Sequence, residues 1–206
     1  MGMPKALLPF GDELMLQRVV RILSGVVDSV VVVAAAAQEL PPLSGKIEVA
    51  RDQREGCGPL EGLGVGLTAL QDKADVAYVT GCDAPFLQPG FIERLFALLG
   101  NFSVAVPHES VAVPHEKSFY HPLAAVYHCS VLAEIKQLIA ADRMRPAFLF
   151  DQVSTRKVSR EEWQDVDPDS NTLKNINHPA DYFEALKIAG LTATPEVSAA
   201  LDNSTK

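Results

Sequence analysis

Short apolar runs alternate with segments of helical apolar spacing along the first hundred residues. The runs are rich in valine, which is typical of strands that are buried on both faces of a parallel sheet. Strands are predicted over residues 29–35, 47–50 and 75–80, and helices over residues 13–23, 60–71 and 89–99. This order predicts an α/β fold of three α/β/α layers, Rossmann-like, with a doubly wound and mostly parallel sheet.

The second half of the chain repeats these signals at shorter spacing. Strands are predicted over residues 123–127 and 153–158, the latter at a sheet edge, and helices over residues 131–141, 145–150 and 180–189. We therefore expect a single domain over residues 1–191. Residues 192–206 are small and polar, and we expect this tail to be disordered.

Seven residues occur twice in tandem. The sequence SVAVPHE fills residues 103–109 and again residues 110–116. Solenoid repeats have longer periods, so the pattern favours a recent duplication. We expect one copy to supply a strand and the other to lengthen a surface loop, where insertions are tolerated.

Composition limits the classes of function. The chain has 206 residues, of which 48% are hydrophobic, and its net charge is −8. An acidic surface argues against a general nucleic-acid or anionic-membrane binder, although local donors can still bind a small anion. The three cysteines form no CxxC pair, which favours reduced thiols in the cytoplasm. No apolar run approaches the roughly 18 residues of a transmembrane helix, and we read no signal peptide at the start.

Two charged residues are candidates for phosphate chemistry. Asp83 follows the strand over residues 75–80, and ligands of doubly wound sheets bind at the carboxyl ends of strands. Its carboxylate suits Mg²⁺, which bridges phosphate oxygens, but it could equally cap the turn before Pro85. Lys5 is either an ordinary surface lysine or a point charge that stabilises a transferred phosphoryl group.

Glycines and amides suggest further contacts. The glycine-rich residues 56–66 could bring backbone N–H groups close to a ligand, although such turns are also common connectors. Asn175 and Asn177 are two residues apart, so on an extended segment both could face one pocket; Asn177 could also cap the following helix. A lone histidine such as His121 is more often structural than catalytic.

Five segments, in this order, resemble the molybdenum cofactor guanylyltransferases of the MobA type. They are MGMPKALLPFG at the start, Asp52 with GPLEGL (58–63), CDAPFL (82–87), HPLAAVY (121–127) and NINHPADY (175–182). The last segment best separates this group from the sugar-phosphate nucleotidyltransferases. The resemblance spans nearly the whole chain and implies a Mg²⁺-dependent nucleotidyltransferase. Such an enzyme moves GMP from GTP to molybdopterin and releases pyrophosphate.

The resemblance also implies roles for individual residues. Asp83 would be the metal ligand and, with Lys5, would form the catalytic pair at the nucleotide phosphates. The positions expected to bind GTP are Gly2, Lys5, Asp52, Gly58, Pro59, Leu60 and Asp83. The positions expected on the molybdopterin side are Asn175, Asn177 and His121. Proteins that deliver molybdopterin or mature molybdoenzymes would be further partners.

Two features depart from the family pattern. The family begins with a central strand and the loop LAGGxSxRMGxxK, of which only Met1-Gly2-Met3-Pro4-Lys5 is present here. We therefore expect the first strand to be missing and its neighbours to expose unpaired edges. Either the true start lies about 15–20 residues upstream, given the length of a strand and a loop, or the chain is a degenerate relative. In addition, the apolar residues 33–37 replace the family's asparagine after the second strand.

Three functional hypotheses follow. The first is guanylyl transfer to molybdopterin. The second is cytidylyl or sugar-phosphate nucleotidyl transfer on the same fold. The third is a non-catalytic module that binds a pterin or a nucleotide, motivated by the shortened phosphate loop.

Overall fold

The structure is a computed structural model, which describes residues 3–52, 58–109 and 119–202. The first half contains the elements predicted from the hydrophobic pattern, together with a short turn and hairpin before the first helix. In chain order these are η1 (Lys5–Leu7), β1 (Pro9–Phe10), β2 (Glu13–Leu14), α1 (Met15–Ser24), β3 (Val30–Ala35), β4 (Ile47–Asp52), α2 (Pro59–Leu70), β5 (Val76–Thr80) and α3 (Pro89–Leu99).

The second half also follows the predicted order. Its elements are β6 (Val104–Glu109), β7 (Phe119–Tyr120), β8 (Ala124–His128), η2 (Cys129–Val131), α4 (Leu132–Ala140), α5 (Ala147–Phe150), β9 (Thr155–Val158), η3 (Arg160–Glu162), η4 (Asn171–Leu173), α6 (Pro179–Ile188) and α7 (Pro195–Asp202). The first copy of SVAVPHE supplies β6, and the second copy lies outside the described residues. Short β7 was not predicted, because two residues carry no periodicity.

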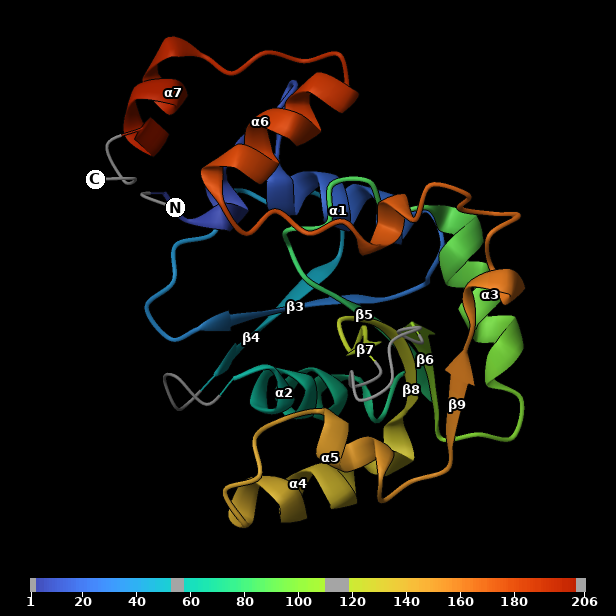
Figure 1. Ribbon diagram of the computed structural model, residues 1–206. Coiled ribbons are helices and arrows are strands. Elements are labelled where there is room, and N and C mark those ends of the chain that lie inside the picture. The colour runs from blue at the N-terminus through green and yellow to red at the C-terminus, as the bar shows by residue number, and fades with distance from the viewer. Residues whose placement is uncertain (1–2, 53–57, 110–118, 203–206) are drawn as a thin grey trace.

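The strands lie between two layers of helices (Figure 1). Helices α1, α6 and α7 lie on one side of the strands, and α2, α4 and α5 lie on the other. Helix α2 packs against β3, β4 and β5, and against α4. This arrangement confirms the predicted α/β fold.

The sheets are more mixed than predicted. Strands β3 and β4 are parallel, with Val30 opposite Ile47. In the other sheet β8 lies between β5 and β6 and is antiparallel to both, while β9 is parallel to β6. The prediction of a mostly parallel sheet is therefore wrong for this part. The chain reverses at β7, which pairs antiparallel with β6, and β8 keeps that reversed direction.

The described strands form three sheets, which are the small β1–β2 hairpin, the β3–β4 pair and the five-stranded sheet, and β3 and β5 are not paired with each other. A cavity of about 440 Å³ lies between β3 and β5, and helix α2 contacts both of these strands. Its lining includes Val30 and Val31 of β3 and Ala77 and Tyr78 of β5. Among the described residues, the edges of β3 and β5 that face this cavity have no strand partner.

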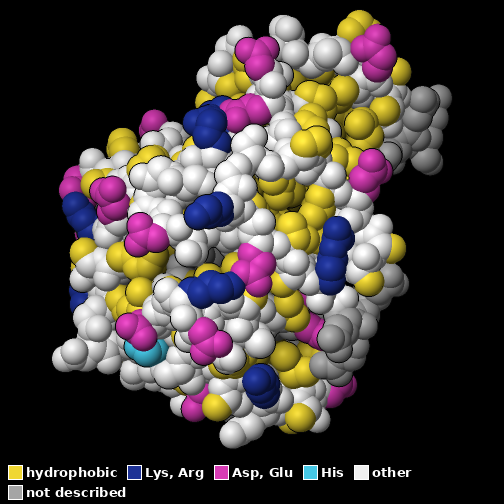
Figure 2. Space-filling model, turned by 180° about the vertical axis from the view of Figure 1, so that it is seen from behind, with side chains coloured by type: hydrophobic (Ala, Val, Ile, Leu, Met, Phe, Trp, Pro, Cys, Tyr) yellow, Lys and Arg dark blue, Asp and Glu magenta, His cyan; other side chains and the backbone are white. Residues whose placement is uncertain are grey.

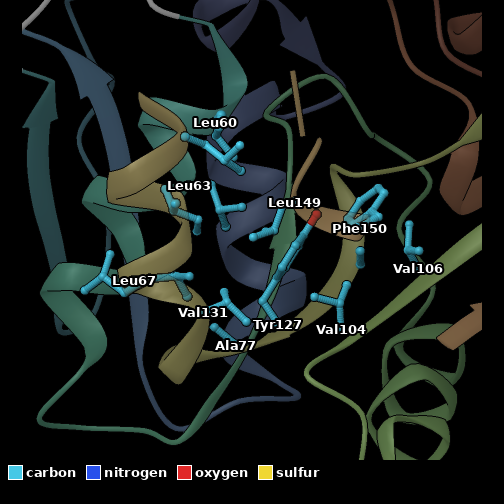
Figure 3. Packing of buried hydrophobic residues seen from close by; sticks show 14 residues of the cluster. Leu60, Leu63, Leu67, Ala77, Val104, Val106, Tyr127, Val131, Leu149 and Phe150 are labelled. Atoms are coloured by element: carbon cyan, nitrogen blue, oxygen red, sulfur yellow. The ribbon is translucent and has the colours of Figure 1, made fainter. Parts of the chain in front are cut away.

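The main core lies between the five-stranded sheet and the helices α2, α4 and α5. Leu60, Leu63 and Leu67 project from α2 toward Tyr127 and Leu149, and all five side chains are buried (Figure 3). Their spacing of three and four residues explains why this segment forms a helix with one face in the core.

The C-terminal tail is not disordered as predicted. Residues 195–202 form α7, which buries Val197 and Leu201 against Leu8, Phe10 and Met15. The tail reads as polar because Val197 and Leu201 are separated by small residues in the sequence. Their spacing of four nevertheless places both side chains on one face of a helix. Residues 203–206 lie outside the described part of the chain.

On the face opposite to the view of Figure 1, positive and negative side chains are interspersed with hydrophobic ones (Figure 2). A nucleic-acid-binding surface is typically a patch or stripe of lysine and arginine. That face therefore lacks the pattern expected of a nucleic-acid binder.

Candidate functional site

Three residues from distant segments meet at the carboxyl end of β5. The Lys5 ammonium donates to Asp83 Oδ2 and to Asn177 Oδ1, each at 2.8 Å. The side chain of Asp83 is 17% exposed and that of Lys5 is 31% exposed, so the pair faces solvent on one side. The three residues come from η1, from the loop after β5 and from the segment before α6. The structure thus brings together three of the residues singled out from the sequence.

Backbone contacts fix the loop that carries Asp83. The amide of Ile176 donates to the Asp83 carbonyl at 2.9 Å, and Arg18 Nε donates to the Pro85 carbonyl at 2.7 Å. Gly81 makes room for the carboxylate, because a Cβ at this position would overlap Asp83 Oδ1. The loop is therefore shaped to hold this carboxylate in place.

Carboxylates outside the cluster order the segment that carries Asn177. Asp181 accepts hydrogen bonds from the backbone amides of Asn177 and His178, at 2.8 and 2.7 Å. These two donors hold the pKa of Asp181 below its ordinary value. Further upstream, buried Asp167 accepts from the amide of Thr172 at 2.8 Å. The caps leave the side chain of Asn177 available for Lys5.

A pocket of about 400 Å³ adjoins the cluster. It is lined by Phe119, Tyr120, His121, Pro122, Leu123, Ala124, Leu173, Asn175 and Asn177. Both asparagines line it, which confirms that they face one pocket. His121 also lines it, so the three residues expected on the molybdopterin side share this cavity.

His121 is largely buried beside the Glu109 carboxylate. Its Nε2 atom is buried without a hydrogen-bond partner among the described residues and lies 3.8 Å from Glu109 Oε1. Burial lowers the pKa of His121, and the Glu109 carboxylate opposes that shift. The corner beside it is fixed by the Tyr127 hydroxyl, which donates to the Pro122 carbonyl at 2.8 Å.

Asp52 lies apart from this cluster, at the end of β4. Burial raises the pKa of its carboxyl above the ordinary value, and the charge of Glu61 raises it further. Its Oδ1 atom is buried with no hydrogen-bond partner among the described residues. Asp52 is thus a carboxyl with a raised pKa at the end of β4, on the stretch of chain that leads to α2.

The other residues expected to bind GTP divide into three groups. Gly58 precedes α2 with a φ of 75°, a conformation that favours glycine, and both Gly58 and Pro59 are exposed. Leu60 is fully buried in the main core, so its side chain cannot contact a nucleotide. Gly2 lies outside the described residues.

Comparison with known proteins places this geometry in a family. The family model described as "MobA-like NTP transferase domain" matches residues 1–156. The chain belongs to the MobA-like NTP transferase family. The resemblance recognised from the sequence motifs is therefore confirmed at the level of the family.

Relatives from distant organisms support this membership. The chain is 32% identical over 189 residues to a protein of Methanosarcina acetivorans named "Probable molybdenum cofactor guanylyltransferase", covering 86% of this chain and 80% of that one. It is also 32% identical over 186 residues to a protein of the same name from Mycobacterium ulcerans, covering 88% and 84%.

Solved structures share the family's fold. Molybdopterin-guanine dinucleotide biosynthesis protein A from Archaeoglobus fulgidus matches with a TM-score of 0.71 at 20% identity, covering 92% of each chain. The 2-C-methyl-D-erythritol 4-phosphate cytidylyltransferase of Thermus thermophilus matches with a TM-score of 0.71 at 18% identity, covering 91% of this chain and 94% of that one. At these identities the likeness establishes an α/β nucleotidyltransferase fold.

Metal binding in this family member would depend on few protein ligands. The described residues contain no group of three or more His, Cys, Asp or Glu side chains that could hold a metal ion. The oxygens of Asp83 and Asn177 nevertheless fit Mg²⁺, because this ion commonly uses one or two carboxylates together with waters and substrate phosphates. Lys5 bonds to Asp83 Oδ2 and to Asn177 Oδ1, so the other carboxylate oxygen of Asp83 is the one it leaves open to an ion.

Three residues of the site were not singled out from the sequence. Gly81 had a signal, since it directly precedes the segment CDAPFL (82–87), but its role depends on where the Asp83 carboxylate folds. Asp181 had one too, as an acidic residue in the first turn of a predicted helix. Phe119 had none, because its position follows from the pairing of β7.

Among the described residues, no helix has both the length and the apolar character needed to cross a membrane.

Proposed function

We propose that the protein transfers a guanylyl group from GTP to the phosphate of molybdopterin and releases pyrophosphate. The observation that carries this proposal is the meeting of Lys5, Asp83 and Asn177 at 2.8 Å beside the pocket of Asn175. The printed names of the curated relatives, "Probable molybdenum cofactor guanylyltransferase", support the choice of nucleotide and acceptor.

The reaction needs charge neutralisation more than a protein nucleophile. An oxygen of the acceptor phosphate forms a bond to the α-phosphorus of GTP, and the bond from that phosphorus to the bridging oxygen of pyrophosphate breaks. Pyrophosphate leaves with the electron pair. Both substrates are anionic, so catalysis consists chiefly of positioning and electrostatic stabilisation.

Lys5 and Asp83 have complementary roles in this scheme. When bound, Mg²⁺ would supply positive charge that offsets the negative charge of the phosphates. Asp83 would hold it, with its carboxylate kept in place by the Ile176 hydrogen bond and by the space above Gly81. Lys5 would then turn from Asp83 to the triphosphate, where its ammonium offsets the charge that develops on the leaving group.

The nucleotide would lie on the side of β4 and α2. Backbone amides at a helix N-terminus favour anions, and the exposed Gly58 lets a ligand approach the first turn of α2 closely. Asp52 would accept a hydrogen bond from a ribose hydroxyl through its unpartnered Oδ1. Asn175 and Asn177 would face the acceptor.

Pyrophosphate release tests the proposal directly. The purified protein is incubated with Mg²⁺ and molybdopterin and with GTP, CTP, ATP or UTP in turn. Release with GTP that requires both Mg²⁺ and molybdopterin is the expected result. Release with CTP but not GTP would establish the cytidylyl alternative instead. Molybdopterin binding without any GTP binding or turnover would indicate the non-catalytic module.

A further inference from the structure

Phe119 exposes an aromatic ring at the pocket beside the cluster. Its side chain is 58% exposed, the highest value among the exposed large hydrophobic residues of the described chain. The others are Val49, Phe102 and Ile188, and none of them lines this pocket. Exposing an aromatic ring to water is unfavourable. An exposed ring at the wall of a pocket therefore suggests that it contacts a ligand.

Strand β7 holds this ring in place. It pairs with β6 through Glu109 opposite Phe119 and His108 opposite Tyr120. Because side chains alternate along a strand, Tyr120 turns inward. Its ring centroid lies 5.2 Å from that of Phe150. Phe119 turns outward, and its ring meets that of His121 with centroids 4.9 Å apart and planes at 78°.

Amide groups face the pocket from its other wall. The side chain of Asn177 bonds to Lys5, whereas that of Asn175 has no hydrogen-bond partner among the described residues. An asparagine amide offers a donor and an acceptor side by side, which matches the edge of a nitrogen heterocycle. The volume of about 400 Å³ is within the range of small-ligand pockets.

We propose that Phe119 is a specificity-determining residue that stacks on the planar nitrogen heterocycle of the acceptor, while Asn175 bonds to the edge of that ring. This rests on the proposed function, which makes the heterocycle a pterin. The flat face of such a ring gains from stacking on an aromatic side chain, and its polar edge needs hydrogen bonds when it leaves water.

The position of the pocket favours the acceptor over the guanine of GTP. The pocket is built from β7, from the residues before β8 and from residues 173–177. Asp52 and the first turn of α2 lie instead on the side of β3 and β4. Asp83 lies after β5, between the pocket and the side of β3 and β4. A phosphate bound at Asp83 could therefore be reached by the acceptor from the pocket and by the nucleotide from the other side.

Binding of 6-hydroxymethylpterin, a stable fluorescent pterin, tests the proposal without requiring turnover. Its affinity is measured by equilibrium dialysis for the wild type and for Phe119→Ala, Phe119→Tyr and Phe102→Ala. Phe102 is 40% exposed and lies outside the pocket, so its variant is the matched control. We expect Phe119→Ala to weaken binding about 10-fold, given the usual gain from stacking on an aromatic ring. Phe119→Tyr and the control should bind as the wild type does.

Several results would overturn the inference. The wild type could show no saturable pterin binding, or Phe119→Ala could bind the pterin with unchanged affinity. Phe119→Tyr could also lose as much pterin affinity as Phe119→Ala. A parallel titration with GTP separates the two heterocycles, and a loss of GTP rather than pterin affinity in Phe119→Ala would also overturn it. If the wild type binds the pterin as predicted but turns over no GTP, the proposed function fails while the stacking role of Phe119 stands.

Discussion

The two sheets approach the candidate site from opposite sides and differ in how fully their strands are paired. In the five-stranded sheet β8 has a partner on each side, and β6 pairs with β7, β8 and β9. In the β3–β4 sheet, β4 is the one partner of β3 among the described strands, and a cavity of about 440 Å³ separates β3 from β5. The pocket proposed for the acceptor belongs to the well-paired side, whereas Asp52 and the start of α2 belong to the other.

This difference bears on how each substrate side is organised. On the side proposed for the acceptor, Asp181 accepts from the Asn177 amide, Asp167 accepts from the Thr172 amide, and the Lys5–Asp83 pair is formed. On the side proposed for the nucleotide, Asp52 keeps a buried oxygen without a partner among the described residues. A preorganised site binds at lower entropic cost, so we expect the acceptor side to change less on binding than the nucleotide side.

The largest expected effect concerns the residue between the two sides. Asp83→Asn keeps the shape of the side chain but removes its charge, so we expect kcat/KM for pyrophosphate release to fall about 100- to 1000-fold. The control is Asp165→Asn, which removes a carboxylate that pairs with Arg94 at 2.7 Å on the surface. Activity of Asp83→Asn within a few-fold of the wild type would remove Asp83 from the proposed mechanism.

Hydrogen exchange of the free protein would measure the difference between the sheets. Every second amide of β3 points away from β4, toward the cavity, whereas β8 is paired on both sides. We expect the amides of β8 to exchange roughly 100-fold more slowly than the unpaired amides of β3, because local opening costs more where both edges are bonded. Equal protection of both sets would mean that the cavity does not weaken β3.

A smaller effect is expected from Gly81→Ala. The added methyl group would overlap Asp83 Oδ1 and displace the carboxylate without removing it. We expect kcat/KM to fall about 10-fold, since small displacements of catalytic groups are costly. Gly90→Ala is a suitable control, because its nearest neighbour, Val166, would lie at an ordinary contact distance of 3.5 Å. Wild-type activity of Gly81→Ala would show that the carboxylate can move freely.

The smallest effect is a pH dependence at the start of α6. The pKa of Asp181 is lowered in the folded protein by the amides of His178 and Asn177. Its contribution to stability is therefore present above the unfolded pKa and is lost as pH falls through the folded pKa. Thermal unfolding should show wild type more stable than Asp181→Asn near neutral pH, with the difference vanishing in acid. A difference that persists in acid would mean that Asp181 acts by packing instead of by charge.

Much of the fold could be predicted because strong local patterns specify it. The valine-rich run of β3 and the leucine spacing of α2 each identify an element by periodicity alone. The antiparallel place of β8 could not be predicted, because it depends on the reversal at β7. The helix α7 was missed because its stability comes from packing Val197 and Leu201 against the start of the chain.

Some residues of the candidate site could likewise be predicted from the sequence, and others could not. Lys5, Asp83, Asn175 and Asn177 were recognised because they belong to motifs whose order resembles one family. Leu60 belongs to such a motif as well, yet its side chain is buried in the core, since a motif does not say which way each side chain points. Phe119 acts through tertiary geometry that has no signature in the local sequence, and the role of Gly81 depends on where the Asp83 carboxylate folds.

Hydrogen exchange with each substrate tests the assignment of the two sides most directly. GTP with Mg²⁺ should slow exchange at the end of β4 and the first turn of α2, with little change at residues 173–177. Molybdopterin alone should slow exchange at β7 and residues 173–177, with little change at α2. The reverse pattern, or protection by GTP confined to residues 173–177 and β7, would contradict the account.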